Sequence, residues 1–413
     1  MQPRIYLDHS ATTPLHPCVA DAMRDALTLC GNPSSLHHEG RAAREAVESA
    51  RRSVASLIGA QPAEVIFTSG GTESNNTALL SLAEVVRKLG QPLHAVTSPI
   101  EHPSVQKSMQ RLADRGFRVT QLAVDSFGRI DVQSFARLCE VDPPSLVSLS
   151  MVNHELGNIF PVAELTQLAK QRGAWVHCDA VQGVSKLPIS VRELGVDTLS
   201  VSAHKFYGPK GIGALFISGP QPGSCGTMPE LPAFLVGGEQ EKGRRAGTEN
   251  VLAIVGFGRA AKLAQEELLW RVDELRKRRE RLENGLLRLP DVTVHGDPQH
   301  RSPTVCNARF AGVEGDMLLA SLDLDGIAIS TGAACSSGSS EASKVLRGIG
   351  LPRDLARQAV RFSIGIGTTD DDIDRTLSCI AAAVGRIRAL GPSPLLSVPP
   401  KNQQTVQIRF SRP

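Results

Sequence analysis

The sequence predicts an α/β protein with a large, mostly parallel β-sheet that carries helices on both faces, followed by a smaller α+β domain. Between about residues 40 and 250, short apolar runs of β-prone residues alternate with helical patterns, which is typical of a parallel sheet. One long helical pattern then separates this region from a shorter series of strands and helices. The chain has 413 residues, of which 41% are hydrophobic, enough for the cores of two or three domains.

The elements of the first region follow from local spacing. Apolar residues recur at helical intervals from Ala43 to Ile58, and this predicts a helix. Short strands are predicted at 65–67, 93–97, 146–152, 175–178, 198–202 and 212–217. Polar residues follow several of these strands, and parallel α/β sheets bind their ligands at the carboxyl ends of strands. We therefore expect the functional site at that edge of the sheet.

The second region begins with a helical pattern of mixed charge at 251–289. Its further predicted elements are strand 304–310, helix 315–324, strand 326–330, a Gly/Ser-rich loop, helix 341–349, strand 359–364 and helix 370–389. We expect a large domain at 15–257 and a smaller domain formed by 1–14 together with 258–390. Residues 391–413 contain five prolines and few core residues, so we expect a flexible or loosely docked tail.

Composition argues against several functional classes. The formal net charge is only +3, and the one basic run, 276–281, lies in a helical pattern, so direct nucleic-acid binding is not expected. No apolar stretch reaches the length of a membrane span, and the N-terminus lacks a signal-peptide profile, so we expect a cytoplasmic protein. The cysteines show no C-x-x-C spacing, which disfavours zinc and disulfide frameworks. They lie at positions 18, 30, 139, 178, 225, 306, 335 and 379.

The predicted strand 198–202 ends in a segment with reactive side chains, Ser202-Ala-His204-Lys205. A glycine-rich turn follows it. A pyridoxal 5'-phosphate enzyme needs a lysine held at such a strand end, because its amine can form a Schiff base with the cofactor and act as a base. Alone, Lys205 could equally be an ordinary solvent-exposed lysine. The interpretation depends on three further groups that a site of this kind requires.

Candidates for all three groups follow other predicted strands. Asp179 can pair with the pyridinium nitrogen of the cofactor, although it could also be a helix cap or an ion-pair partner. Gly70-Gly71-Thr72 precedes a helix whose N-terminal amides favour a phosphate, with Ser202 and His204 as further donors, although such glycines can mark a simple turn. His102 can stack on the ring, or be a structural histidine. Their joint occurrence at successive strand ends favours a cofactor site.

A loop of small and hydroxyl residues carries the candidate nucleophile. It reads Ser330-Thr-Gly-Ala-Ala-Cys335-Ser-Ser-Gly-Ser-Ser340 and follows a predicted strand. A nucleophilic cysteine must be accessible and able to ionise, and a loop of this composition suits both needs. The alternative is an incidental surface cysteine. The other cysteines are expected to be structural, with Cys178 as the possible exception because it adjoins Asp179.

Further motifs accompany these segments. They are Tyr6-Leu-Asp-His-Ser-Ala-Thr-Thr-Pro14, Gly31-Asn-Pro-Ser-Ser35, Phe67-Thr-Ser-Gly-Gly-Thr-Glu-Ser-Asn-Asn76, Glu101-His102, Met151-Val-Asn-His-Glu-Leu-Gly157, His177-Cys-Asp-Ala-Val-Gln182, Gly237-Gly-Glu-Gln240, Arg244-Arg-Ala-Gly-Thr-Glu-Asn250 and Arg361-Phe-Ser-Ile-Gly365. With them the chain resembles the pyridoxal-phosphate-dependent cysteine desulfurases, fold type I enzymes of the class V aminotransferase superfamily. The likeness is to their nitrogenase-associated and housekeeping iron–sulfur group, and it covers about residues 4–390.

The resemblance implies a role for each matched residue. Lys205 would hold pyridoxal 5'-phosphate covalently, Asp179 would pair with its ring nitrogen, and Gln182 would hydrogen-bond its phenolic oxygen. His102 would stack on the ring and take part in catalysis. The phosphate would be held by Gly71, Thr72, Ser202, His204 and the partner subunit's Thr248. The substrate carboxylate would be bound by Asn153 and Arg361, with Asn32 nearby.

The implied reaction converts L-cysteine to L-alanine. Cys335 would attack the substrate sulfur and hold it as a persulfide, for iron–sulfur cluster assembly or for thio-cofactor or tRNA sulfur supply. A site completed across subunits implies a homodimer. The persulfide implies a sulfur-acceptor protein, either an iron–sulfur scaffold or a tRNA-thiolation relay.

The chain departs from the family pattern in three places, and alternative functions stay open. His9 and His154 stand where the family usually has Asn, and the tail after residue 390 has no evident counterpart. A selenocysteine lyase on the same scaffold is one alternative, although the Cys335 loop favours a desulfurase. A catalytically silent sulfur-relay binding protein is the other, and the intact Lys205, Asp179, His102 and Cys335 argue against it. No metal site is expected, because the histidine pairs lack ligand spacing.

Overall fold

A computed structural model describes residues 3–219, 230–332 and 342–391 of the chain. Its strands are β1 (Ile5–Tyr6), β2 (Val65–Thr68), β3 (His94–Thr97), β4 (Arg118–Gln121), β5 (Leu146–Ser150), β6 (Trp175–Asp179), β7 (Thr198–Ser202), β8 (Gly213–Ile217), β9 (Val292–His295), β10 (Val305–Phe310), β11 (Ile327–Ala328) and β12 (Ala359–Ser363). Its α-helices are α1 (Pro17–Ala26), α2 (His38–Ile58), α3 (Gly71–Lys88), α4 (Pro103–Asp114), α5 (Val132–Val141), α6 (Val162–Lys170), α7 (Val191–Leu194), α8 (Val251–Leu286), α9 (Gly315–Leu324), α10 (Lys344–Gly348), α11 (Arg353–Ala356) and α12 (Asp370–Ala389). Three 3-10 turns are η1 (Pro62–Glu64), η2 (Ala203–Lys205) and η3 (Gln240–Gly243).

The larger part of the structure is a seven-stranded sheet in the order β2-β8-β7-β6-β5-β3-β4. Strand pairs β3–β4, β3–β5, β5–β6 and β6–β7 are parallel, and β8 runs antiparallel to both of its neighbours. The predicted mixed α/β architecture with a mostly parallel sheet is therefore confirmed. The carboxyl ends of β5, β6 and β7 lie together at one edge, where the topology predicts the site.

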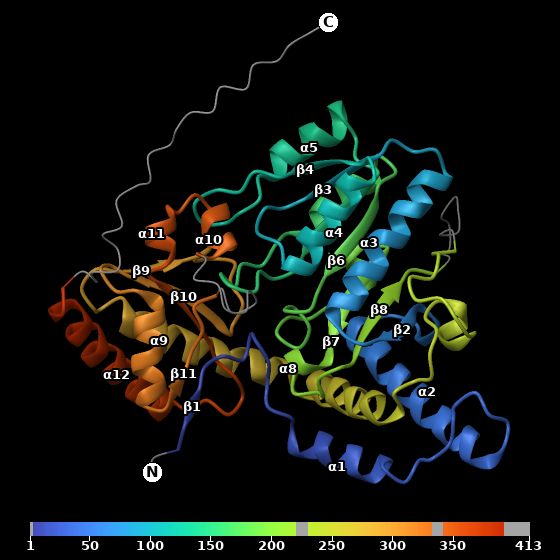
Figure 1. Cartoon of the computed structure of the whole chain (residues 1–413), viewed down its shortest axis with the longest axis horizontal. Helices are drawn as coiled ribbons and strands as arrows, with labels where there is room; N and C mark the ends of the chain where they lie inside the picture. The colour runs from blue at the N-terminus through green and yellow to red at the C-terminus, as the bar shows by residue number, and fades with distance from the viewer. Residues whose placement is uncertain (1–2, 220–229, 333–341, 392–413) are drawn as a thin grey trace, which may run out of the picture.

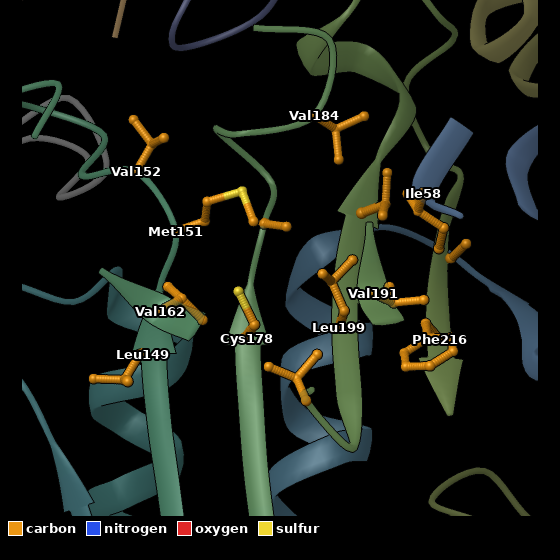
Figure 2. Close-up of a cluster of buried hydrophobic side chains, with 14 of the residues drawn as sticks. Ile58, Leu149, Met151, Val152, Val162, Cys178, Val184, Val191, Leu199 and Phe216 are labelled. Atoms are coloured by element: carbon orange, nitrogen blue, oxygen red, sulfur yellow. The ribbon is translucent and has the colours of Figure 1, made fainter. Parts of the chain in front are cut away.

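One face of this sheet is apolar along a continuous row. Leu149, Cys178, Leu199 and Phe216 are successive register partners on β5, β6, β7 and β8, and all four are buried. Figure 2 shows these side chains among the buried residues of one hydrophobic cluster. Because side chains alternate along a strand, Asp179 points to the opposite face, where it reaches Asn75 on α3. The buried apolar face fixes the register of β6, and the side chain of Asp179 on the opposite face is therefore directed toward the site.

A second, smaller region is built by the C-terminal elements with the first strand of the chain (Figure 1). Strands β12, β10 and β9 form an antiparallel sheet, and β1 pairs in parallel with β11. A separate hydrophobic cluster fills this region, and the second half of α8 contributes to it. Helix α8 has 36 residues, about 54 Å at 1.5 Å per residue, and its first half packs on α1 and α2. It therefore connects the two cores directly.

Several element predictions needed adjustment. Strands β4 and β9 were not predicted, because both carry polar residues in place of an apolar run and are only partly buried. The predicted strand 326–330 is reduced to two paired residues, and α8 ends three residues before the predicted boundary. No described helix is long and apolar enough to cross a membrane.

Candidate active site

A cavity of about 280 Å³ opens at the carboxyl ends of β5, β6 and β7. Helix α3 begins on one side of it, and the smaller region contributes residues from the other side. Nine of the residues singled out in the sequence line it: Gly71, Thr72, His102, Asp179, Gln182, Ser202, His204, Lys205 and Arg361. Side chains from positions 71 to 361 therefore converge on one space of a size suited to a small cofactor with its substrate.

Lys205 ends the 3-10 turn η2 that directly follows β7. Its Nζ donates hydrogen bonds of 2.7 Å to the carbonyl oxygens of Ser10 and Ala11. These two residues come from the N-terminal segment that follows strand β1, and both line the cavity. The Oγ of Ser10 is buried and finds no hydrogen-bond partner among the described residues. The amine is thus held at the cavity wall by carbonyls, beside a polar atom that a ligand could satisfy.

The start of α3 forms the side of the cavity suited to an anion. Gly70 has a φ of 150°, in the region that favours glycine. A Cβ on Gly71 would lie 2.6 Å from Cγ2 of Val181, so only glycine allows this close approach. The helix begins with free backbone amides and a positive dipole end. Ser202 borders the same space.

His204 lies beside the anion side of the cavity as a neutral imidazole. Burial, and then the positive charge of Lys205, lower its pKa to about 4. Its Nδ1 shares a 3.1 Å hydrogen bond with the hydroxyl of Thr12. A neutral ring in this place can donate a hydrogen bond to a phosphate from its other nitrogen.

The carboxylate of Asp179 is fixed from both of its oxygens. Asn75 donates to Oδ2 at 2.7 Å, and the backbone amide of Val181 donates to Oδ1 at 3.0 Å. His102 lies nearby as the N-cap of α4. Burial lowers the pKa of His102, the charge of Asp179 opposes that shift, and Lys205 adds to it. An oriented carboxylate and a neutral imidazole therefore face the same cavity.

Lys186 is a buried charge that the sequence reasoning missed. Its Nζ donates to Oε1 of Gln182 at 2.6 Å, and Nε2 of Gln182 donates to the carbonyl of Ser10 at 2.9 Å. Burial, and then the charges of Lys205 and Arg361, lower the pKa of Lys186 to about 7. The available sequence signal is the spacing of four residues between Gln182 and Lys186, which lie on the same turn. Lys186 fixes the orientation of the Gln182 amide, with its oxygen turned away from the Ser10 carbonyl.

Arg361 reaches the cavity from the central part of β12 in the smaller region. Its Nη2 forms a 2.8 Å ion pair with Asp8, and Nη1 donates to the carbonyl of His154 at 3.0 Å. Its Nε is buried with no hydrogen-bond partner among the described residues. Asp8 is a second residue that sequence reasoning did not assign to the site. The guanidinium is thus rigidly held and keeps one donor unsatisfied.

Ser330 connects Arg361 to the cysteine loop. The two residues exchange backbone hydrogen bonds of 2.6 and 3.2 Å, and Gly332 lines the cavity. Cys335 lies three positions further along the chain, outside the described residues. The described chain therefore brings the base of the predicted nucleophile loop to the cavity.

Three predicted substrate or cofactor residues do not line the cavity. The Asn153 side chain is fully engaged by backbone groups: its Nδ2 donates to Ile100, and its Oδ1 accepts from the amides of Glu155 and Leu156. Asn32 and Thr248 are exposed. Within this single chain the structure does not bring these three to the site, and their assigned roles stay predictions.

The residues that line the cavity fit pyridoxal phosphate. The group needs an amine, a carboxylate at the ring nitrogen and an anion cradle at its phosphate. Lys205, Asp179 and the start of α3 supply these three groups on one cavity. The unpaired Oγ of Ser10 and the glycine-only approach at Gly71 are further signs of a built ligand site.

Comparisons with known proteins agree with this geometry. The family model described as aminotransferase class-V matches residues 5–376. Cysteine desulfurase IscS of Dictyoglomus turgidum is 42% identical over 394 residues, which cover 95% of this chain and 97% of that protein. Cysteine desulfurase IscS of Escherichia coli O139:H28 is 41% identical over 392 residues and covers 94% of each chain.

Solved structures show the same likeness. A NifS-like protein superposes with a TM-score of 0.84 at 34% identity, covering 93% of this chain and 100% of that one. DndA from Streptomyces lividans superposes with a TM-score of 0.72 at 38% identity, covering 87% and 99%. These matches extend over nearly the whole chain, including both regions of the structure. The chain therefore belongs to the aminotransferase class-V family and, within it, to the cysteine desulfurases.

Proposed function

We propose that this enzyme converts L-cysteine to L-alanine and carries the removed sulfur as a persulfide on Cys335. The observation that carries the proposal is the convergence of Lys205, Asp179 and Arg361 on one cavity. An amine, a ring-nitrogen carboxylate and a carboxylate-binding guanidinium are the groups that amino-acid chemistry with pyridoxal phosphate requires. The family to which the chain belongs supports the same reaction.

The chain's own residues have distinct tasks in this reaction. Pyridoxal phosphate, held by Lys205, Asp179 and the start of α3, would supply an electron sink for charge that develops at the substrate Cα. The Lys205 amine takes the proton from Cα. Arg361 binds the substrate carboxylate and thereby orients the Cα–H bond.

The sulfur step balances without an external oxidant or reductant. The Cys335 thiolate attacks the substrate sulfur, the Cβ–S bond breaks, and a proton added at Cβ completes alanine. One cysteine and one enzyme thiol thus become one alanine and one enzyme persulfide. A thiol of an acceptor protein then takes the terminal sulfur by exchange.

Cys335 is favoured over the buried cysteines for this task. Burial raises the pKa of Cys139 to about 11 and that of Cys306 to about 12. Burial, and then the nearby Asp179 and Glu101, raise the pKa of Cys178 well above its ordinary value. These thiols stay protonated at neutral pH and cannot meet a substrate, because nucleophilic cysteines must ionise and be accessible. Cys178 is therefore best explained as a core residue.

The proposal also covers the oligomeric state, the cellular location and the sulfur acceptor. We infer a homodimer in which the partner subunit's Thr248 completes the phosphate site, and a cytoplasmic location. The acceptor would be an iron–sulfur scaffold or a tRNA-thiolation relay protein. The exposure of Thr248 in the single chain is compatible with such a shared site.

Alanine release from L-cysteine and from L-selenocysteine, compared under reducing conditions, tests the proposal. We expect turnover of cysteine by the purified protein. Cys335→Ala should retain the cofactor spectrum and lose sulfur release from cysteine, whereas Cys18→Ala, at an exposed cysteine on α1, should be unaffected. Turnover of selenocysteine alone would instead identify a selenocysteine lyase, and inactivity on both would favour a silent sulfur-relay protein.

A further inference from the structure

A continuous run of hydrogen bonds joins His102 to Asp179 along the wall of the cavity. Ser104 Oγ lies 2.8 Å from Nδ1 of His102 and accepts from Nδ2 of Asn75 at 2.9 Å. The same Asn75 nitrogen donates to Asp179 at 2.7 Å. Oδ1 of Asn75 lies 3.0 Å from Nε2 of His177. All of these side chains except His102 are at least nine-tenths buried, so the direction of each hydrogen bond is set by its neighbours.

The carboxylate of Asp179 sets the direction at one end. An ionised carboxylate only accepts, so the amide nitrogen of Asn75 must face Asp179 and its oxygen must face His177. Nε2 of His177 therefore carries a proton. Its Nδ1, 2.9 Å from the hydroxyl of Thr198, then accepts, because burial lowers the pKa of His177 to about 4 and keeps the ring neutral.

The helix cap sets the direction at the other end. The backbone amide of Ser104 donates to Nδ1 of His102 at 3.2 Å. A backbone amide can only donate, so Nδ1 of His102 must carry the lone pair. In the neutral ring the proton is then on Nε2. This nitrogen forms no hydrogen bond to another described residue. His102 lines the cavity, so this N–H is its polar group toward a ligand.

The hydroxyl of Ser104 joins these two independent assignments. It accepts from Asn75, so its own hydrogen is available for Nδ1 of His102. That nitrogen is an acceptor on the evidence of the helix cap alone. Both ends of the run therefore require the same arrangement of protons, in which the amide and the hydroxyl of Ser104 share the single lone pair of His102 Nδ1.

We propose that Asn75 and Ser104, supported by His177, are positioning residues that hold His102 in the tautomer with the proton on Nε2. The carboxylate of Asp179, which accepts from Asn75 and Val181, and the cap of α4 are the two anchors of this device. Neither Asn75 nor Ser104 needs to touch the substrate. The inference rests on the proposed function only for its catalytic consequence: neutral His102 presents a hydrogen-bond donor to the cofactor and substrate, and not a base.

The tautomer can be measured without reference to activity. In full-length protein labelled with 15N-histidine, the imidazole nitrogens distinguish protonated from lone-pair sites at pH 7.5, with and without added pyridoxal phosphate. The signals of His102 are those lost in His102→Gln. We expect Nε2 protonated and Nδ1 unprotonated. A proton on Nδ1 in the wild-type protein would overturn the proposal.

Ser104→Ala tests the link itself. Loss of one hydroxyl donor should shift the tautomer equilibrium of His102 about fivefold toward Nδ1–H, the equivalent of one neutral hydrogen bond of about 1 kcal/mol. Ser104→Thr keeps the hydroxyl and should restore the wild-type pattern. Ser108→Ala is the matched control, because Ser108 is a buried serine on the same helix whose Oγ bonds to Asn76. Nitrogen signals of Ser104→Ala identical to wild type would contradict the proposal.

Turnover separates this inference from the proposed function. With L-cysteine, Ser104→Ala should lower kcat about fivefold and leave KM unchanged, since a hydrogen bond to a catalytic histidine acts on the chemical step. If the tautomer is as expected but no substrate is turned over, the positioning device stands and the proposed function fails. If cysteine is turned over and Ser104→Ala changes neither kcat nor the nitrogen signals, the proposed function stands and the positioning device fails.

Discussion

The two sides of the cavity are built in opposite ways. On the cofactor side, Asp179 ends β6, His102 follows β3 and Lys205 follows β7, all strands of one sheet. These side chains are oriented by neighbours within residues 68–205 or by the N-terminal segment. On the substrate side, Arg361 is oriented by Asp8, 353 positions away in the sequence. Apart from the contact of Lys205 with Ser10 and Ala11, the first side follows from the topology of a parallel sheet, whereas the second exists only after two distant segments have met.

The two ways of orienting side chains suit two kinds of ligand, one bound permanently and one that exchanges. Rigid local hydrogen bonds suit a group that is bound permanently, because they fix charge and tautomer once. A guanidinium held by one carboxylate and one carbonyl, with no partner for Nε in the part of the chain that the structure describes, suits a group that arrives and leaves. We therefore expect substitutions on the two sides to change different measured quantities.

The largest effect is expected from Lys205→Ala, which breaks the cofactor side. Turnover of cysteine should fall by about 10²- to 10⁴-fold or more, because the base is lost, and the absorbance of covalently held cofactor should disappear. Lys210→Ala is the control, because Lys210 is exposed in the same segment. Retention of both the spectrum and the activity in Lys205→Ala would assign the cofactor lysine elsewhere.

Arg361→Lys should affect the substrate side alone. Lysine keeps the charge but loses the planar pair of donors, so KM for cysteine should rise about tenfold, in line with one charged hydrogen bond. Cofactor affinity and spectrum should stay unchanged. Arg309→Lys on the neighbouring strand β10 is the control, because Arg309 contacts Thr293 away from the cavity. A loss of cofactor binding in Arg361→Lys would show that the two sides are not separable.

Glu101→Gln should alter stability and leave turnover nearly unchanged. Glu101 is buried behind His102, where it accepts hydrogen bonds from Ser98 and Ser150. Burial raises its pKa from 4.5 to about 7. The folded protein therefore keeps a proton that the unfolded chain loses, and the free energy of unfolding falls as pH rises from 4.5 to 7.

The size of this effect follows from linkage. Across that window the wild-type protein should lose roughly 3 kcal/mol relative to Glu101→Gln, whose amide does not ionise. Chemical denaturation of both proteins at several pH values gives the difference, with Glu266→Gln, an exposed residue of α8, as the control. Parallel stability curves for wild type and Glu101→Gln would mean that the pKa of Glu101 is the same in the folded protein as in the unfolded chain.

The cofactor side could be predicted from the sequence because its signals are local. The predicted strands 146–152 and 175–178 differ from β5 and β6 by at most two residues at an end, and an apolar run followed by a polar group is enough to place Asp179. Edge strand β4 was missed because it lacks such a run. The ion pair between Asp8 and Arg361 leaves no local pattern, because the two residues are 353 positions apart. Asn75 and Ser104 sit inside helical segments as ordinary polar residues, and only tertiary contacts show that they connect.

The contacts of the N-terminal segment determine when, during synthesis of the chain, the site can form. Its carbonyls at Ser10 and Ala11 hold the Lys205 amine, and its strand is secured by the 2.8 Å hydrogen bond from the Ser10 amide to the hydroxyl of Ser363. A ribosome adds about 5–20 residues per second, so roughly 8–30 s separate the synthesis of Lys205 from that of Ser363. During that interval the first residues of the nascent chain have no β12 to bind. The reactive amine is therefore enclosed only after β12 has been synthesised, when the residues of both sides of the cavity are present.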